Sequence, residues 1–514
     1  MRIAAVAAAS LLLGCGGPSG GSVALVLDIP NGVLDPKGYS SVEIRLHQDS
    51  GDTEINVAVT NNAFDLGETE VKTGVLIEAV LRTDSGAAVG YGRAAAPSDL
   101  TAGAEIVVPV RRPIVYFSGL VSTDQDGNPN TNDIHWTTAP GTYSDLSTDS
   151  SLDGSTVLDQ KAVVMVAAGP KLFMIDQQPS DPNGTLTGAP TIKNVSTGDH
   201  SITGSLPATM SGGVLDAAGS DDGRLLLVGT SMKLFVVDTE TGLAKPVADG
   251  SFSRLAVVTA GGGALTAIAI RNRGSTTGSC STTAELVWVA VGADDANQVM
   301  TIASGGFSDV AGDRGRAFYI DACKGELGEA SATGITMKRT GLGKPTALAV
   351  SGSQAWIGIE KPGKPAQMAL VSAALEGMDP PRTLFSEPSE QVVEALSFPG
   401  VQRRLSADSA IFNGLEVGAG GDYIAMTLSS TYTGQAIPAA SFPQMTIESQ
   451  ELRVIDAATG AAVQRYRSWC DGTLLIAPGD ILNWGCATSP GQSAPTNLNL
   501  EHRIASMTFQ YGKK

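Results

Sequence analysis

Short apolar runs separated by turn residues recur along the whole chain, and this pattern most limits what the chain can fold into. Runs rich in valine, isoleucine, leucine and alanine end at glycine, aspartate or serine, and the 514 residues include 61 glycines but only 17% charged residues. Such runs are typical of short strands that end in tight turns. The best helical period, at residues 386–396, is short. We therefore expect an all-β protein in which helices supply at most a few turns.

Weak repeats occur in the region after residue 113. Residues 163–176 (VVMVAAGPKLFMID) and 225–238 (LLLVGTSMKLFVVD) align without a gap. Residues 234–243 (LFVVDTETGL) and 452–461 (LRVIDAATGA) share an apolar strand followed by Asp, two residues, Thr and Gly. In such a turn the Asp and Thr side chains hydrogen-bond the backbone, and Gly takes a positive φ. A repeat over about 400 residues predicts similar sheets packed side by side.

The strand-Asp-x-x-Thr-Gly pattern resembles the blades of β-propellers of the YVTN and quinoprotein-like kind, and it covers residues 113–514 with gaps. The resemblance implies four-stranded blades around a central channel. At roughly 50 residues or more per blade, this region gives seven blades, with six or eight also open. The last strand, 503–512, is expected to pair near 114–122 and close the ring, because closure removes exposed sheet edges.

Residues 22–112 have the pattern of six or seven short alternating strands. That number of strands in about 90 residues is typical of a small β-sandwich of the immunoglobulin or transthyretin-like kind. The sequence Arg111-Arg112-Pro113 marks the expected boundary with the propeller. Because the segment contains neither cysteine nor tryptophan, the prediction extends to sandwich architecture only. We expect a spacer or binding module.

The first residues of the chain predict export. Residues 1–14 are apolar with one basic residue, and they are too few to span a bilayer as a helix, which takes about 20 residues. The sequence Leu12-Leu13-Gly14-Cys15 resembles the lipobox of bacterial lipoproteins. The resemblance implies a removed signal peptide, a lipid on Cys15 and a flexible tether at 15–21. Because Gly16 rather than Asp follows, it also favours the outer membrane; an ordinary signal peptide is the alternative.

Four further cysteines are expected to pair with one another. An even number in an exported chain, without a CxxC spacing, favours two disulfides over a zinc site. Cys470 and Cys486 bracket a segment with two turn signals and form the expected local pair. Cys280 and Cys323 pair by elimination.

The sharpest local feature is STDQDGNPNTND at residues 122–133. Its oxygen-bearing residues follow the order of an EF-hand calcium loop: Ser122, Asp124, Asp126, Asn128 through its carbonyl, Asn130 and Asp133. Position one is Ser rather than Asp, and the last ligand is Asp rather than Glu. Ordinary turn chemistry accounts for the same composition. A structural Ca²⁺ and a metal-free turn both stay open.

Composition and spacing exclude several classes of function. The chain has 34 basic and 52 acidic residues, for a net charge of −18, so no nucleic-acid partner is expected. The histidines lie far apart, and we expect surface or loop positions for them: His47, His135, His200 and His502. The one GxSxG match, at 17–21, lies in the tether, where no nucleophile elbow can form. Catalytic residues are therefore not evident.

The sequence predicts a non-catalytic, lipid-anchored binding or scaffold protein of the cell envelope. It would sit at the outer membrane, facing the periplasm or the cell surface, and its propeller would dock a partner protein. The alternative is an enzyme with its site at the central channel, either a lactonase-like hydrolase or a quinoprotein-like enzyme. Three or more carboxylates converging at the channel mouth would favour the enzyme. A plugged channel with exposed apolar side chains would favour docking.

Overall fold

The structure, a computed structural model, is almost entirely β-strand. Within the described residues the only helical element is a single 3₁₀ turn, η2 (Ala419–Gly421), and no helix there is long and apolar enough to cross a membrane. The all-β prediction is confirmed. The described residues are 20–29, 39–48, 51–59, 69–72, 75–96, 103–123, 129–138, 154–157, 162–177, 189–197, 201–261, 264–273, 283–292, 297–361, 363, 365–377, 379–387, 390–394, 402–437, 445–469, 480–482 and 506–512.

Two sheets build the amino-terminal unit, residues 20–110. The first has the order β4-β1-β7, with β1 parallel to β7: β1 (Gly20–Asp28), β4 (Thr69–Lys72) and β7 (Glu105–Pro109). The second has the order β3-β2-β5-β6: β2 (Ser41–Gln48), β3 (Gly51–Ala58), β5 (Leu76–Arg82) and β6 (Ala88–Ala95). Alternate apolar side chains of both sheets share one core, which includes Leu25, Ile44, Ile77 and Val108.

Seven sheets follow in the described part of residues 112–512. The first joins β37 (Ser506–Gly512) to β8 (Arg112–Thr123), β9 (Pro129–Thr138) and β10 (Gly154–Val157). The second has β11 (Ala162–Ala168), β12 (Lys171–Asp176), β13 (Thr191–Val195) and β14 (Ile202–Leu206). The third has β15 (Val214–Gly219), β16 (Leu225–Thr230), β17 (Lys233–Asp238) and β18 (Ala244–Asp249). The fourth has β19 (Phe252–Gly261), β20 (Ala264–Arg271), β21 (Ala284–Val291) and β22 (Asn297–Gly305).

The remaining three sheets continue this order. The fifth has β23 (Phe307–Asp313), β24 (Arg316–Asp321), β25 (Glu326–Ser331) and β26 (Gly334–Arg339). The sixth has β27 (Lys344–Ser351), β28 (Gln354–Lys361), β29 (Gln367–Ala374) and β30 (Arg382–Glu387). The seventh is six-stranded, with β31 (Glu390–Glu394), β32 (Gln402–Gly418), β33 (Tyr423–Ile437), β34 (Met445–Asp456), β35 (Ala462–Trp469) and β36 (Asp480–Leu482). The helical period at 386–396 is misleading, because residues 390–394 form β31.

These sheets are arranged as a β-propeller. Their inner strands contact one another in chain order, from β11 through β15, β19, β23 and β27 to β32, and then through β37 back to β11. An apolar cluster fills the space between each pair of neighbouring sheets, including the pair formed by the seventh and the first. Because the final strand β37 pairs with β8, from Ser506 opposite Ser118 to Gly512 opposite Arg112, the predicted closure is confirmed.

The Asp-x-x-Thr-Gly turns have the predicted chemistry. Asp238 Oδ1 accepts the backbone N–H groups of residues 240 and 241 at 2.9 and 2.8 Å, and Gly242 has a φ of 71°. Asp456 Oδ1 accepts those of residues 458 and 459 at 3.1 and 2.7 Å, and Gly460 has a φ of 78°. Counted outward from the inner strands β15 and β32, both turns join the third strand to the fourth, so this repeat aligns equivalent positions.

The other repeat aligns positions that are not equivalent. Residues 163–176 cover β11 and β12, the first and second strands of their sheet. Residues 225–238 cover β16 and β17, the second and third strands of the next sheet. Successive hairpins of a propeller blade share the same apolar pattern, because every strand is packed on both faces, and the sequence match does not distinguish them.

Candidate functional site

The central channel is lined by inner strands that share one irregularity. The strands β11, β15, β19, β23, β27 and β32 each shift register by one residue against their second strand. A bulge of this kind bends the strand and redirects a side chain. The residues directly after the bulge in three consecutive sheets are Asp216, Arg254 and Asp309. The bulges thus place three charges at one level of the ring.

A cavity of about 410 Å³ occupies the channel. Its wall contains residues of all seven inner strands, from Met165 on β11 to Met507 on β37. Its polar side chains are Asp216, Arg254, Asp309, Asn413, Glu416 and Thr427. Leucine, valine and alanine side chains complete the lining.

The channel carboxylates connect neighbouring inner strands. Asp216 Oδ2 accepts the backbone N–H of Leu255 on β19 at 2.8 Å. Asp309 Oδ2 accepts that of Leu348 on β27 at 2.9 Å. Glu416 Oε2 accepts that of Phe509 on the closing strand β37 at 3.0 Å. Inner strands of adjacent sheets are not paired with each other, so each carboxylate satisfies a backbone donor between two sheets.

Arg254 extends across the channel. Its Nη2 donates to the carbonyl oxygen of Asn413 on β32 at 3.2 Å, three sheets further around the ring. Its Nε lies 3.5 Å from Asp309 Oδ1. The guanidinium therefore bridges Asp309 on β23 and Asn413 on β32 at the level of the bulges. Hydrogen bonds in which one partner is charged are stronger than those between neutral groups.

Burial changes the acidity of these groups. Burial raises the pKa of Asp216 to about 6, although the charge of Arg254 opposes the rise. Burial likewise raises the pKa of Glu416 to about 7, against the hydrogen bond from Phe509. The pKa of Asp309 is raised for the same reason, and Arg254 again opposes the rise. Such values suit proton transfer near neutral pH, and structural burial produces them equally.

The described residues offer no metal centre. No group of three or more His, Cys, Asp or Glu side chains among them is arranged to hold a metal ion. In the channel the carboxylates are drawn instead toward backbone N–H groups and Arg254. A metal-assisted hydrolase would need ligands that the described part of the channel does not bring together.

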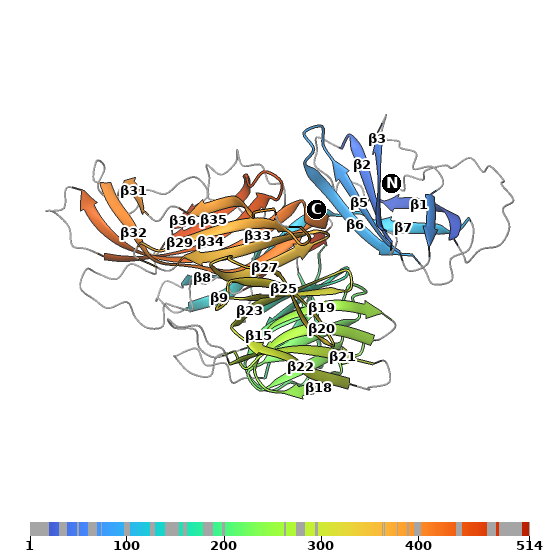
Figure 1. Ribbon diagram of the computed structural model, residues 1–514, viewed down its shortest axis with the longest axis horizontal. Helices are drawn as coiled ribbons and strands as arrows, with labels where there is room; N and C mark the ends of the chain where they lie inside the picture. The colour runs from blue at the N-terminus through green and yellow to red at the C-terminus, as the bar shows by residue number, and fades with distance from the viewer. Residues whose placement is uncertain are drawn as a thin grey trace.

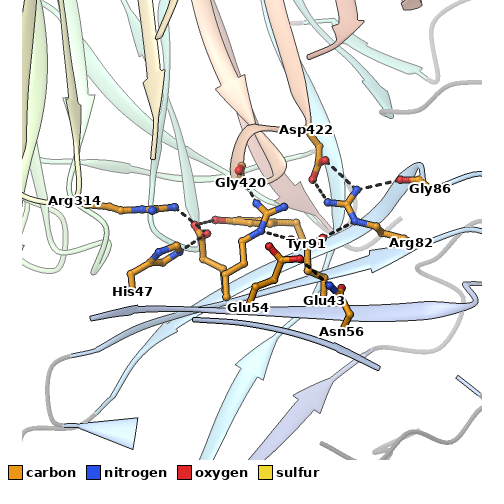
Figure 2. Close-up of polar contacts among 12 residues, drawn as sticks. Glu43, His47, Glu54, Asn56, Arg82, Gly86, Tyr91, Arg314, Gly420 and Asp422 are labelled. Carbon is orange, nitrogen blue, oxygen red and sulfur yellow. Dashed lines mark hydrogen bonds and ion pairs between the residues drawn. The ribbon is translucent and has the colours of Figure 1, made fainter. Parts of the chain in front are cut away.

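The amino-terminal unit lies over one mouth of the channel. The turns that follow β15, β23 and β32 lie at this mouth, and each contacts the sheet β3-β2-β5-β6. Arg93 on β6 pairs with Asp221 of the first turn, and Glu78 on β5 pairs with Arg314 of the second. Arg82 binds Asp422 of the third turn with both guanidinium Nη atoms, at 2.9 and 3.1 Å (Figure 2). Three sheets spread around the ring are thus held by one surface, which we call the capped face.

Glu78 is the centre of this interface. Its carboxylate lies 2.7 Å from His47 Nε2, accepts a hydrogen bond of 2.5 Å from the Tyr91 hydroxyl and lies 3.3 Å from Arg314 Nη2. Burial would raise its pKa, but these partners outweigh burial and hold the pKa at about 2. Arg314 has a φ of 48°, which costs a non-glycine residue about 1 kcal/mol or more.

The opposite face, which we call the free face, carries exposed apolar side chains within the described residues. Leu215, the bulged residue of β15, lines the cavity and is exposed. Met232, in the turn between β16 and β17, and Ile411, two residues before the bulge in β32, are exposed on the same side of the ring. The outer ends of β31 and β32 and the amino-terminal unit lie at opposite ends of the molecule (Figure 1). The capped face is thus in contact with the amino-terminal unit, whereas the free face presents exposed apolar side chains.

The predicted calcium residues are only partly within the described residues. Ser122 lies in β8, and Asn130 and Asp133 lie in β9, which pairs with β8. Asp124, Asp126 and Asn128 lie outside the described residues. Residues 129–138 and 154–157 form the strands β9 and β10. The calcium site stays a prediction.

The lipidation and disulfide predictions also stay open. Cys15, Cys280, Cys470 and Cys486 lie outside the described residues. Cys323 lies in the turn after β24, where its backbone N–H donates to Asp321 Oδ1 at 2.9 Å.

The prediction of surface histidines is wrong for His47. Its side chain is only 7% exposed, because it lies in the interface between the amino-terminal unit and the ring. Trp356 is buried between the sixth and seventh sheets, and Trp288 is partly buried between the fourth and fifth sheets. Nothing in the local sequence around His47 marks an interface.

Four channel residues were not predicted from the sequence: Asp216, Arg254, Asp309 and Glu416. A shared sequence pattern precedes Arg254 and Asp309. The segments GSFSR at 250–254 and GGFSD at 305–309 both have Gly-x-Phe-Ser before the charged residue. Both segments enter inner strands at the bulge. A charge directly inside an apolar strand, repeated after the same tetrapeptide, indicates the channel.

No protein-family model matches the chain, and no curated protein matches it. Among solved structures, the chain is similar to the periplasmic gluconolactonase of Pseudomonas aeruginosa, with a TM-score of 0.32 at 15% identity over 71% of this chain and 96% of that one. The β-propeller domain of the Trilobed protease from Pyrococcus furiosus gives 0.36 at 10% identity over 73% and 90%. The WD40 repeats of RRP9 give 0.35 at 12% identity over 53% and 88%.

These scores are too low to carry an inference about function. The fold rests on the chain's own arrangement of sheets, in which the inner strands contact one another around the channel and the final strand joins the first sheet. The chain is a β-propeller protein with a two-sheet amino-terminal unit.

Proposed function

We propose that this protein is a lipid-anchored binding protein of the cell envelope that docks a partner protein on the free face of a seven-bladed propeller. Cys15 carries the lipid at the outer membrane. The amino-terminal unit, a β-sandwich of the immunoglobulin or transthyretin-like kind, serves as a fixed spacer between the membrane anchor and the ring. The protein is non-catalytic in this proposal.

The difference between the two faces of the ring carries the proposal. The capped face is occupied by the amino-terminal unit through Asp221, Arg314 and Asp422. The free face keeps the exposed side chains of Leu215, Met232 and Ile411. Large apolar side chains that gather on an accessible face mark protein interaction sites, and we take these three as the contact positions.

The contacts within the channel support a structural role for its carboxylates. Asp216, Asp309 and Glu416 each accept a backbone N–H of the next inner strand. Arg254 spans the channel to Asn413. A catalytic acid or base must have an oxygen within reach of its substrate. A carboxylate that connects two strands must keep its hydrogen bond to the backbone N–H of the neighbouring strand.

Photo-crosslinking of the membrane-anchored full chain tests the proposal. A photoreactive residue at Met232 or Ile411 is expected to give one adduct of constant mass in native membranes. The same residue at Val107, which is exposed on β7 of the amino-terminal unit, is the matched control and is expected to give none. Adducts from Val107 alone, or none from either free-face position, would contradict docking on this face. The Cys15→Ala variant is expected to leave the membrane fraction.

A hydrolase at the channel is the second candidate, and one observation favours it. The cavity of about 410 Å³ contains Glu416, whose pKa is raised to about 7 by burial. A carboxyl group of that acidity can donate or accept a proton near neutral pH. Turnover of a lactone or ester that is abolished by both Glu416→Gln and Asp216→Asn would establish this candidate over docking.

A further inference from the structure

We infer that the amino-terminal unit is a clamp on the closure of the propeller ring. The ring closes where the seventh sheet meets the first, and the closing strand β37 belongs to the first sheet although it comes last in the chain. This junction, which we call the seam, depends on non-covalent pairing of β37 with β8. The amino-terminal unit contacts the seam through both apolar and polar groups.

The apolar core of the seam contains residues of three parts of the chain. Val80, Ala88 and Tyr91 come from the amino-terminal unit. The first sheet supplies Val115, Phe117, Met507 and Phe509, and the seventh supplies Tyr423, Ala425, Leu452 and Val454. These side chains are almost completely buried, so separating the amino-terminal unit would expose apolar surface of both sheets at the seam.

The clusters between the other sheets are built differently. Each of the six other junctions has its own apolar cluster, and within the described residues each consists of the two neighbouring sheets alone. The amino-terminal unit also reaches the third and fifth sheets, but there it makes ion pairs with turns, at Asp221 and Arg314. The shared apolar core is therefore specific to the seam.

Polar contacts fix the clamp in place at the turn between β32 and β33. The Tyr423 hydroxyl donates to the carbonyl oxygen of Ala88 at 2.7 Å, and both groups are buried. Arg45 Nη1 donates to the Gly420 carbonyl oxygen at 2.8 Å. Gly420 has a φ of 66°, and a Cβ at this position would lie 3.0 Å from both Arg45 Nη1 and Tyr91 Cε2. The turn is thus shaped for close approach of the amino-terminal unit.

Residues 109–111 link the amino-terminal unit to β8, and they connect the clamp to the first sheet, on the other side of the seam. The backbone of Tyr91 exchanges two hydrogen bonds, of 2.8 and 2.9 Å, with Arg111, directly before β8 begins. A Cβ at Gly92 would lie 2.2 Å from the carbonyl oxygen of Pro109. Strand β6 therefore holds β8 through the backbone while it holds the seventh sheet through Tyr423 and the shared core.

Amide hydrogen exchange of the full chain tests the clamp. The Tyr423→Phe variant keeps the aromatic side chain in the apolar core and removes one buried hydrogen bond, the one to the Ala88 carbonyl oxygen. We expect exchange of β37 and of residues 112–118 to accelerate by about fivefold or more, because a buried acceptor loses its partner and the local opening equilibrium shifts. Exchange of β24 and β25, on the fifth sheet, is expected to stay unchanged.

Two further variants make the result specific. Asp422→Asn weakens the Arg82 contact at the seam and is expected to act like Tyr423→Phe. Asp221→Asn is the matched control, since it weakens a contact between the same two units at the third sheet, and it is expected to leave β37 unchanged. Unchanged exchange of β37 in both seam variants, or equal acceleration in the control, overturns the clamp. Uniform acceleration in all sheets also overturns it.

Discussion

Replacement of Glu416 by glutamine tests whether the channel carboxylates are structural. Glutamine keeps a carbonyl oxygen that accepts the N–H of Phe509 and cannot ionise. The pKa of Glu416 rises from an ordinary 4.5 to about 7 through burial, so the folded protein holds its proton more tightly than the unfolded chain. The stability from this group is fully present below pH 4.5 and is lost as the pH rises through 7.

The size of the effect follows from the pKa. At about 1.4 kcal/mol per pKa unit, the rise corresponds to at most about 3 kcal/mol. Because Glu416 lines a cavity that water can enter, we expect about 1–3 kcal/mol. Glu416→Gln should match the wild type at pH 4.5 and be more stable by that amount at pH 8.

Amide exchange of Phe509 on the closing strand reports this difference locally, and denaturant unfolding at both pH values reports it globally. The Glu54→Gln variant, at an exposed carboxylate on β3, is the control and should show no such pH-dependent gain. Glu416→Ala lacks the acceptor and should be less stable than Glu416→Gln at both pH values, by about 1–3 kcal/mol. A glutamine variant that is less stable at pH 8, or a difference that does not change with pH, would refute the structural reading.

Three further predictions concern other parts of the molecule. Gly312→Ala should cost about 1–3 kcal/mol of unfolding free energy, because its Cβ would lie 2.0 Å from the Val257 carbonyl oxygen, whereas Gly204→Ala, with its nearest neighbour at 4.0 Å, should be close to neutral in the same denaturant titration. The pKa of Glu78 is lowered to about 2, so its contribution is present above pH 4.5 and lost as the pH falls toward 2; the stability gap between wild type and Glu78→Gln should therefore shrink from pH 7 to pH 3. A calcium ion at residues 122–133 predicts a melting temperature that falls with chelator and recovers with Ca²⁺, and an unchanged melting temperature leaves an ordinary turn there.

Features set by neighbouring residues could be predicted from the sequence. The strands follow from alternating apolar residues, and the turns at Asp238 and Asp456 follow from the local bonding of Asp with the positive φ of Gly. The closure by residues 506–512 was predictable because an open ring would leave two unpaired edges. The alignment of 163–176 with 225–238 failed because successive hairpins within a blade carry the same apolar pattern.

Features that depend on distant segments could not be predicted. Asp216 and Glu416 lie 200 residues apart, and only the ring brings them to one cavity. The interface around Glu78 needs the tips of turns from three sheets, whose sequences are ordinary turn sequences. Arg314 is an exception in part, because an arginine before Gly315 in a tight turn, where asparagine suits a positive φ, indicates a side chain kept for another contact.

Docking on the free face is tested most directly by the affinity of the crosslinked partner, once purified, for two matched variants. Met232→Asp places a charge on the free face, and Met300→Asp places one on the outer strand β22, where the methionine is also exposed. Docking on the free face predicts that Kd rises at least about tenfold for Met232→Asp and stays unchanged for Met300→Asp, as expected for a desolvated contact. An unchanged Kd for Met232→Asp, or a larger loss for Met300→Asp, would contradict it.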